Sequence, residues 1–261
     1  MFGNGPSKIL ISVVLFSNHA FTQQSAPLKI TVGDPIVNGA RLQPYQNQWS
    51  MTMVKPDGDV VQDAGNWKDE LEAVEINGKP ALQRTQMATF KKRNGEVGAT
   101  TRTINIFDRK TLAPLSRAYE KHIRGGSDSS LSIKFGADSM KLENTENGKS
   151  EVKELPTTAA YDFYGGIYAV LWAAMPLSHR FSVTYPSYGE NEHPEKVSWV
   201  TATVTRSETV DAGTKGRVKA WVIESDTDIG KLKYWVSRKS PYIIRMDYTQ
   251  KDGTIWMLKM I

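Results

Sequence analysis

The chain has 261 residues, of which 39% are hydrophobic and 23% charged, proportions that exclude a disordered protein and favour a globular one. It contains no cysteine, which excludes disulfides, thiolate nucleophiles, zinc ribbons and iron–sulfur clusters. The net charge is +5, but the lysines and arginines are scattered rather than gathered in one stripe, which argues against nucleic acid as a partner.

The first 26 residues predict a signal peptide followed by a linker. Lys8 precedes an apolar run at residues 9–16, and polar and small residues follow as far as Ala20. The apolar run is shorter than the ~20 residues that span a bilayer, and no transmembrane helix is expected in the mature chain. The alternative is a buried N-terminal strand. The pattern therefore predicts an exported protein, periplasmic in a bacterium with two membranes.

Residues 27–261 are expected to form a single β-rich domain, of which residues 27–100 are the less certain part. From about Trp49 onward, apolar residues recur with period two, and turn signals such as Asn77-Gly78 interrupt them. This spacing favours an antiparallel meander. The C-terminal strands are predicted at residues 197–205, 217–224, 231–237, 242–249 and 254–261.

Several late strands are apolar on both faces. In residues 254–261, Ile255 and Met257 face one side, and Trp256 and Leu258 face the other. A flat sheet with one face in water would alternate more regularly. The pattern therefore predicts a strongly curved sheet, a half-barrel.

One segment interrupts this β pattern, because residues 159–175 have helical spacing and Pro176 ends them. Thr157 or Thr158 is a suitable N-cap, and Asp162 falls in the first turns, where the helix dipole favours an acid. The predicted helix is apolar nearly all round, which is typical of a buried helix. The predicted fold is therefore mainly β, with a strongly curved antiparallel sheet wrapped around one apolar α-helix.

Three motifs carry a resemblance to a bacterial family. Residues 104–115 contain the pattern Phe-Asp-x-x-Thr-Leu-x-Pro, residues 161–175 are followed by Pro-Leu, and residues 234–245 form a strand, a Ser-Pro-Tyr turn and a second strand. Over about residues 100–261 the chain resembles the domain of unknown function 3108. The resemblance implies a periplasmic half-barrel, similar to the lipoprotein-localisation factors, that offers an apolar cavity. It implies no catalytic residues.

The polar residues do not form a recognisable site. No two histidines have the spacing of metal ligands, and no Gly-x-Ser-x-Gly elbow or phosphate-binding loop is present. His122 is expected on the exposed side of a strand, and Asp108 is expected to open a turn by binding backbone amides. No catalytic residue, metal site or cofactor is therefore predicted.

The aromatic helix is the main candidate for ligand binding. Its tyrosines and tryptophan either form the core of the sheet or line a pocket for an acyl chain or similar ligand, since Tyr brings a hydroxyl to an apolar wall. The candidate ligand-binding residues on the helix and the late strands are Tyr161, Tyr164, Tyr168, Trp172, Trp221, Trp256 and Arg245.

These features predict a non-enzymatic periplasmic protein that binds a lipid, a lipoprotein or another apolar component of the envelope. The alternative is a structural or assembly scaffold of the envelope that uses the same fold, binds a protein partner and has no ligand. A hydrolase whose carboxylates cannot be paired from the sequence is the third and weakest hypothesis.

Overall fold

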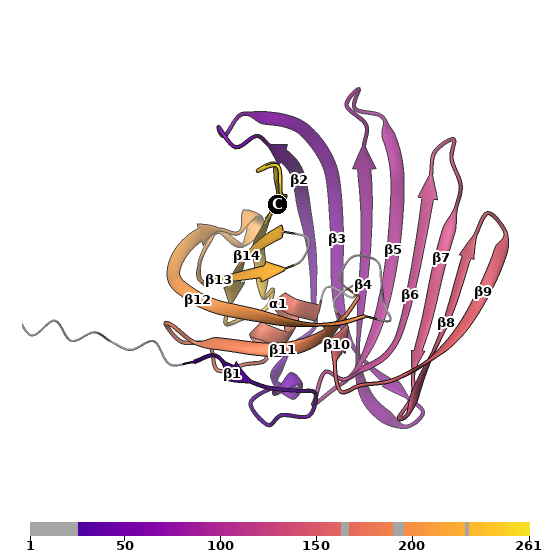
Figure 1. Cartoon of the computed structure of the whole chain (residues 1–261). Coiled ribbons are helices and arrows are strands. Elements are labelled where there is room, and N and C mark those ends of the chain that lie inside the picture. Colours follow the sequence, from indigo (N-terminus) through magenta and orange to yellow (C-terminus); the bar gives the residue numbers. More distant parts are fainter. Residues whose placement is uncertain (1–25, 163–166, 190–195, 228–229) are drawn as a thin grey trace, which may run out of the picture.

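The computed structural model describes residues 26–162, 167–189, 196–227 and 230–261. These residues form one large, strongly curved β-sheet that does not close on itself (Figure 1). The strands of the N-terminal half are β1 (Leu28–Lys29), β2 (Tyr45–Val54), β3 (Val60–Ile76), β4 (Lys79–Lys91), β5 (Val97–Asp108), β6 (Pro114–Ile123), β7 (Ser129–Phe135), β8 (Ser139–Glu146) and β9 (Lys149–Pro156). The strands that follow are β10 (Tyr161–Asp162), β11 (Ser182–Tyr188), β12 (Val197–Asp211), β13 (Arg217–Thr227), β14 (Gly230–Ser237), β15 (Ile243–Thr249) and β16 (Ile255–Met260).

The sheet consists of two antiparallel meanders that are joined along one pair of strands. One meander runs from β2 to β9, the other from β11 to β16, and the pairing of β16 with β2 unites them. The predicted antiparallel meander is therefore confirmed within each of these two parts. The two short strands β1 and β10 differ from the prediction, because both pair with β11 in parallel.

Turn chemistry sets the register of the long hairpins. Asn77 and Gly78 connect β3 to β4 with φ values of 52° and 76°, the left-handed pair that a type I′ turn requires. Asn147 and Gly148 connect β8 to β9 in the same way, with φ values of 54° and 75°. The first of these turns confirms the prediction from Asn77-Gly78, and the second has the same dipeptide.

A glycine marks the place where β3 bends. Gly65 has a φ of 126°, and a Cβ atom there would lie 1.8 Å from the carbonyl oxygen of Thr89 on β4. The pairing of β2 with β3 shifts register beside it, between Met51 and Thr52. The close approach of the two backbones explains why no side chain fits at this position.

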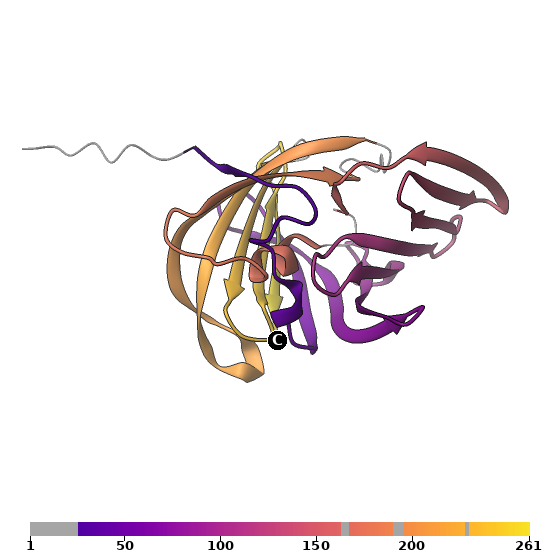
Figure 2. The same cartoon turned by 90° about the horizontal axis from the view of Figure 1, so that it is seen from below.

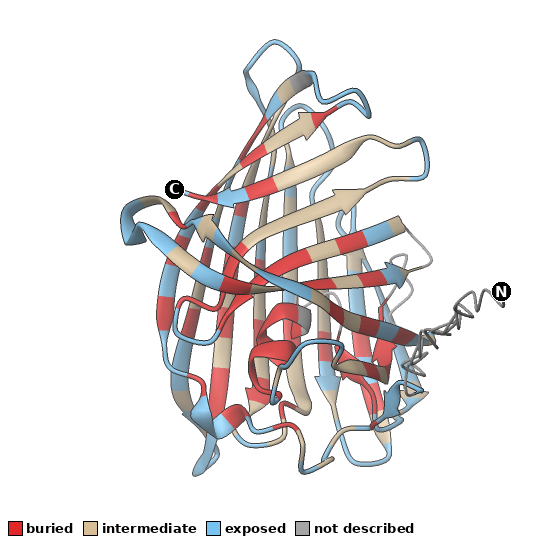
Figure 3. Ribbon diagram, turned by 90° about the vertical axis from the view of Figure 1, so that its left-hand side faces the viewer, coloured by how far each residue is buried: buried red, intermediate tan, exposed pale blue. Residues whose placement is uncertain are grey.

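The one α-helix described, α1 (Ile167–Ala173), is shorter than the predicted helix at residues 159–175. Tyr161 and Asp162 form β10 instead, because their backbone groups pair with β11. Asp162 therefore does not serve a helix N-terminus, and residues 163–166 lie outside the described part. The described side chains of α1 are buried, as Figure 3 shows, and belong to the main hydrophobic core together with residues of the sheet.

The two ends of the curved sheet differ. We call the end formed by the β2–β3, β4–β5, β6–β7, β8–β9 and β15–β16 turns the hairpin end. At the opposite end, the segment of residues 30–44 crosses from β1 to β2 through the short 3-10 helix η1 (Gly39–Arg41). Seen from below (Figure 2), η1 and α1 lie next to each other on the inner side of the sheet. We call the segment of residues 30–44 the plug and this end of the sheet the plugged end.

The plug at residues 30–44 binds directly to the C-terminus of α1. The guanidinium group of Arg41 donates to the carbonyl oxygens of Ala173 at 2.7 Å and Met175 at 2.5 Å. The backbone N–H of Asn38 donates to the carbonyl oxygen of Ala174 at 3.0 Å. These bonds satisfy carbonyl groups that a helix end leaves without intrahelical partners.

The Phe-Asp-x-x-Thr-Leu-x-Pro motif holds the same plug from the other side. Asp108 accepts hydrogen bonds from the backbone N–H groups of Lys110 and Thr111, as predicted. Burial tends to raise the pKa of Asp108, but these hydrogen bonds outweigh it and hold the pKa below its usual value. The turn presents Arg109, whose Nη2 donates to the carbonyl oxygen of Leu42 at 2.8 Å.

The late Ser-Pro-Tyr turn contacts the plug as well. The hydroxyl of Tyr242 accepts from the backbone N–H of Gln43 at 2.7 Å, and Ser240 donates to the carbonyl oxygen of Pro44 at 3.2 Å. The three motifs of the sequence resemblance are far apart in the chain, yet each borders the plugged end. Together they support this end of the sheet.

Candidate functional site

Buried polar side chains cross the inner face of β2 to β6. Arg84, Asn105 and Arg117 are direct neighbours in the register of β4, β5 and β6, and all three are buried. Strand alternation puts every second residue on this face. We call the set the polar belt, and its members are Asn47, Asp69, Arg84, Gln86, Thr103, Asn105 and Arg117.

An ion pair between β3 and β4 forms the centre of the polar belt. Arg84 donates through Nε and Nη2 to the two oxygens of Asp69, each at 2.7 Å, and Tyr45 donates to the same carboxylate at 3.0 Å. Burial tends to lower the pKa of Arg84, but the charge of Asp69 outweighs it, and the pKa lies above its usual value. Burial also raises the pKa of Tyr45. The guanidinium stays charged and the phenol neutral.

A second ion pair joins β6 to β10 across the inner side of the sheet. Arg117 Nη1 donates to Asp162 Oδ1 at 2.6 Å, and both side chains are almost fully buried. Because β6 and β10 do not pair in the sheet, this contact links its two distant parts. A small second core reinforces the link, since Tyr188 of β11 packs against Phe135 of β7 with ring centres 5.6 Å apart.

Apolar side chains at the hairpin end remain partly exposed on the inner face. The rings of Phe90 on β4 and Trp256 on β16 meet edge to face, with centres 6.4 Å apart. Phe90 is the register partner of Gly65, which has no side chain. We call the group the aromatic rim. Its members, which pack against the main core without being fully covered, are Met53, Trp67, Phe90, Met246, Tyr248 and Trp256.

Two of the predicted ligand-binding residues lie in the core. Tyr161 is 0% exposed and stacks edge to face on Tyr185, and Trp172 is 1% exposed and stacks on Tyr234 of β14. Tyr161 reaches the segment 30–44, where its hydroxyl donates to the carbonyl oxygen of Thr31. These two side chains are covered by protein, which agrees with the core interpretation.

The other predicted candidates are divided between the two faces. Trp256 belongs to the aromatic rim, and Trp221 packs partly exposed against the core with Arg238 over its ring. Arg245 lies half-buried between the ring of Trp235, 4.3 Å away, and the carboxylate of Asp247.

Tyr164 lies outside the described residues, and for Tyr168 only the backbone, in α1, is described. Of the predicted group, the described residues therefore bring only Trp256 to the aromatic rim.

Sequence reasoning missed the polar belt. Asp69 lies in a run where charged residues occupy neighbouring positions on both faces, between Lys68 and Glu70, so that no alternation distinguishes the buried acid. Arg84 and Arg117 likewise resemble surface residues. The pairing of consecutive strands makes Asp69 and Arg84 neighbours across the β3–β4 hairpin, but only a contact between distant strands brings Arg117 to Asp162.

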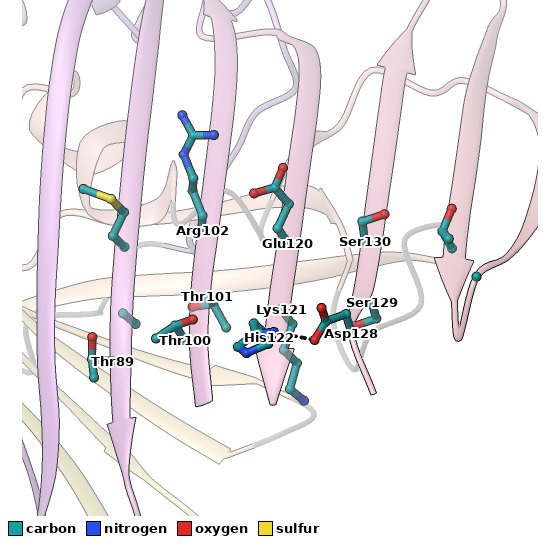
Figure 4. Close-up of a pocket in the computed structure, with 14 residues that line it drawn as sticks. Thr89, Thr100, Thr101, Arg102, Glu120, Lys121, His122, Asp128, Ser129 and Ser130 are labelled. Carbon is teal, nitrogen blue, oxygen red and sulfur yellow. Dashed lines mark ion pairs between the residues drawn. The ribbon is translucent and has the colours of Figure 1, made fainter. Parts of the chain in front are cut away.

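The outer face carries a broad polar depression of about 600 Å³ (Figure 4). Arg102, Glu120 and Ser130 lie in register on neighbouring strands along it. His122 is exposed there, as predicted, and pairs with Asp128 at 2.6 Å. The polar side chains that line it are exposed or half-buried and shallowly arranged.

Within the described residues, no group of three or more His, Cys, Asp or Glu side chains is placed to hold a metal ion. The same part of the chain contains no helix that is long and apolar enough to cross a membrane.

Comparison with known proteins gives a family and a fold. No curated protein matches the chain. Among solved structures, it is similar to a β-barrel-like protein of the domain of unknown function DUF1849 from Brucella abortus. The TM-score is 0.57 and the identity 11%, over 85% of this chain and 97% of the other, so the likeness concerns the fold alone.

The family match extends the resemblance seen in the sequence toward the N-terminus. The model of the protein family of unknown function DUF3108 matches residues 50–257, so the second half of β2 and all of β3 and β4 fall within it. The match covers most of the chain and includes β3 to β6, the aromatic rim and all three motifs that support the plugged end. The chain therefore belongs to the DUF3108 family.

Proposed function

We propose that the protein is a non-enzymatic binding protein of the periplasm that holds a lipid, a lipoprotein or another apolar envelope component at the aromatic rim. The observation that carries the proposal is the partial exposure of Trp67, Phe90 and Trp256 on the inner face. Large apolar side chains that gather on a hollow surface without being covered are typical of a binding site for an apolar partner.

The difference between the two ends supports a direction of entry. At the plugged end, Arg41 and Arg109 fix the segment 30–44 against α1 and the β5–β6 turn. In this proposal the sheet wraps around α1, the plug closes one end, and the apolar ligand enters at the hairpin end. The periplasmic location rests on the apolar run at residues 9–16, and fractionation of cells that express a C-terminally tagged chain tests it.

Native mass spectrometry of the mature protein, purified from the periplasm of its own host, is the decisive experiment. We expect additional mass that organic solvent extracts as an acyl-containing compound. Phe90→Ser should lower the retained amount, because it removes apolar surface from the rim. Met87→Ser is the matched control, since Met87 lies on the same strand but is 42% exposed and lines the outer depression. A bare wild-type mass contradicts the proposal.

A ligand-free envelope scaffold is the second candidate. The complete burial of Tyr161 and Trp172 favours it, because these side chains already have protein partners. Crosslinking in intact cells distinguishes the two functions. A scaffold should give one reproducible crosslinked envelope partner, and Phe90→Ser should leave the yield of that crosslink unchanged. For a ligand carrier, Phe90→Ser should change the yield of crosslinked product.

A further inference from the structure

Three N–H donors lie buried on the inner face without an acceptor. They are Asn47 Nδ2, Trp49 Nε1 and Trp67 Nε1, and none has a hydrogen-bond partner among the parts of the chain that the structure describes. Asn47 is 7% exposed and Trp49 is 2% exposed. Buried polar groups in proteins are nearly always paired, so a group of unpaired donors points to an acceptor that comes from elsewhere.

The three donors are neighbours in the sheet. Asn47 and Trp49 are two residues apart on β2 and therefore project from the same face. Trp49 is paired with Trp67 on β3, and their ring centres lie 5.9 Å apart. The group lies between the polar belt, to which Asn47 belongs, and the aromatic rim, to which Trp67 belongs.

The carboxylate paired with Asn47 in the sheet is already occupied. Asp69, the register partner of Asn47, accepts two hydrogen bonds from Arg84 and one from Tyr45. The buried ion pair is electrically balanced, so the three donors face no excess negative charge. They remain available for a ligand atom.

The chemistry of the group selects the ligand. Three donors without an acceptor match an oxygen that only accepts, such as a carboxylate or ester oxygen. A hydroxyl or an ammonium group would add further donors where donors already lack partners and where Asp69 already accepts from Arg84 and Tyr45, and an unsatisfied buried donor is unfavourable. The adjoining rim offers apolar surface for a hydrocarbon chain.

We propose that Asn47, Trp49 and Trp67 bind the carbonyl end of a single-chain acyl ligand, a fatty acid or its simple ester, whose chain lies along the aromatic rim. This inference rests on the proposed function, since it defines the class of the apolar ligand. A two-chain phospholipid fits less well, because its headgroup would have to enter beyond the carbonyl groups.

Competition against the neutral fluorescent probe 1-N-phenylnaphthylamine tests the assignment with four ligands of equal chain length. Laurate and methyl laurate should displace the probe at concentrations about ten-fold lower than dodecanol or dodecylamine, a difference of ~1.4 kcal/mol. If only laurate is preferred, the ligand is the free acid; if both are preferred, the neutral carbonyl suffices. A diacyl phosphatidylcholine in place of laurate should compete weakly.

Substitutions that remove single donors locate the site. Trp67→Phe keeps an aromatic ring but lacks the N–H, and Asn47→Ala removes the amide. Each should weaken laurate binding about five-fold, the effect of one hydrogen bond, and leave dodecanol binding unchanged. Trp199→Phe is the matched control, because Trp199 is exposed on the outer face. If Trp67→Phe does not fold, the indole N–H resonances of the wild-type protein provide the test, since two should move downfield when laurate is added.

The outcomes separate the two proposals. Equal binding of all four ligands, unaffected by Asn47→Ala, overturns the acyl site and leaves the proposed function standing. The assignment also fails if laurate does not shift the indole resonances. That result is expected if a bound water stays hydrogen-bonded to the donors. If no apolar ligand displaces the probe and the protein from its host carries no extractable mass, the proposed function itself fails.

Discussion

At the scale of single residues, the inner face of this sheet is unusual because it carries buried charged side chains. Arg84 with Asp69, and Arg117 with Asp162, lie almost fully buried where a β half-barrel is expected to hold apolar side chains. Each pair is matched in charge, which reduces the cost of removing the ions from water, but the pairing does not by itself make the fold more stable. A balanced interior keeps its polarity without attracting counter-ions.

Removing one partner of the Asp69–Arg84 pair tests this balance. Asp69→Leu should lower the free energy of unfolding by about 3–5 kcal/mol, because it leaves Arg84 buried without its counter-ion. The double variant with Arg84→Met should recover most of the loss. Urea denaturation measures both. Lys91→Met, which breaks the exposed pair with Asp63, is the control and should cost at most about 1 kcal/mol. An Asp69→Leu loss no larger than the control contradicts the argument.

Asp108 makes a pH-dependent contribution to stability. Its pKa in the folded protein lies below the usual value, so the carboxylate stabilises the fold above the unfolded pKa of about 3.9, and this stability is lost as the pH falls through the folded pKa. Asp108→Asn should therefore cost about 1–2 kcal/mol at pH 7. The difference from wild type should shrink below about pH 4. Urea denaturation at several pH values measures it, and a difference that is constant with pH would count against this role.

At the scale of elements, the sequence predicts strands and turns well but the helix poorly. Asn77-Gly78 determines its turn locally, because only residues that accept positive φ fit a type I′ turn. Tyr161 and Asp162 continue the helical spacing of α1, yet they pair with β11 and Asp162 binds Arg117. These partners, distant in the sequence, override the local preference for helix, and no local sequence pattern predicts them.

The bend of β3 at Gly65 gives an element-scale prediction. Gly65→Ala should lower the free energy of unfolding by more than about 3 kcal/mol, the upper range for ordinary overpacking. The new Cβ atom would overlap the carbonyl oxygen of Thr89, and the φ of 126° disfavours any side chain. Gly58→Ala is the matched control, because Gly58 has a φ of 92° and no atom within 4 Å of the added carbon. Thermal denaturation should give Gly65→Ala a lower Tm than Gly58→Ala.

At the scale of the whole molecule, the plug at residues 30–44 distinguishes one end from the other. Its function was not foreseen, because residues 27–100 show no motif beyond strand-like alternation. The plug depends on Arg41, whose partners are backbone carbonyl oxygens that no sequence pattern identifies. The family motifs are visible in the sequence but their shared contact with the plug is not, since only the fold brings Arg109 and Tyr242 to the same segment.

Loss of Arg41 should loosen the plugged end. Arg41→Ala removes hydrogen bonds from a charged donor to the C-terminus of α1 and should cost about 1.5–3 kcal/mol. The amides of Ala174 and Met175, which bond within that last turn, should exchange hydrogen faster. Lys110→Ala is the control, because the bond of Lys110 to the plug is made by its backbone carbonyl oxygen, which the substitution keeps. Hydrogen exchange resolved by residue measures the effect. Unchanged exchange at both amides would show that Arg41 does not hold the helix.

The pairing of β16 with β2 has a consequence for how the chain reaches this fold. Residues 255–260 are hydrogen-bonded to residues 49–54, so the first long strand obtains its second neighbour only from the last segment of the chain. Until that segment is available, β2 presents an unpaired edge, the kind of surface on which strands of other chains add. Contacts between such distant segments slow folding. A truncated product, or one caught during synthesis, is therefore the species most prone to aggregation.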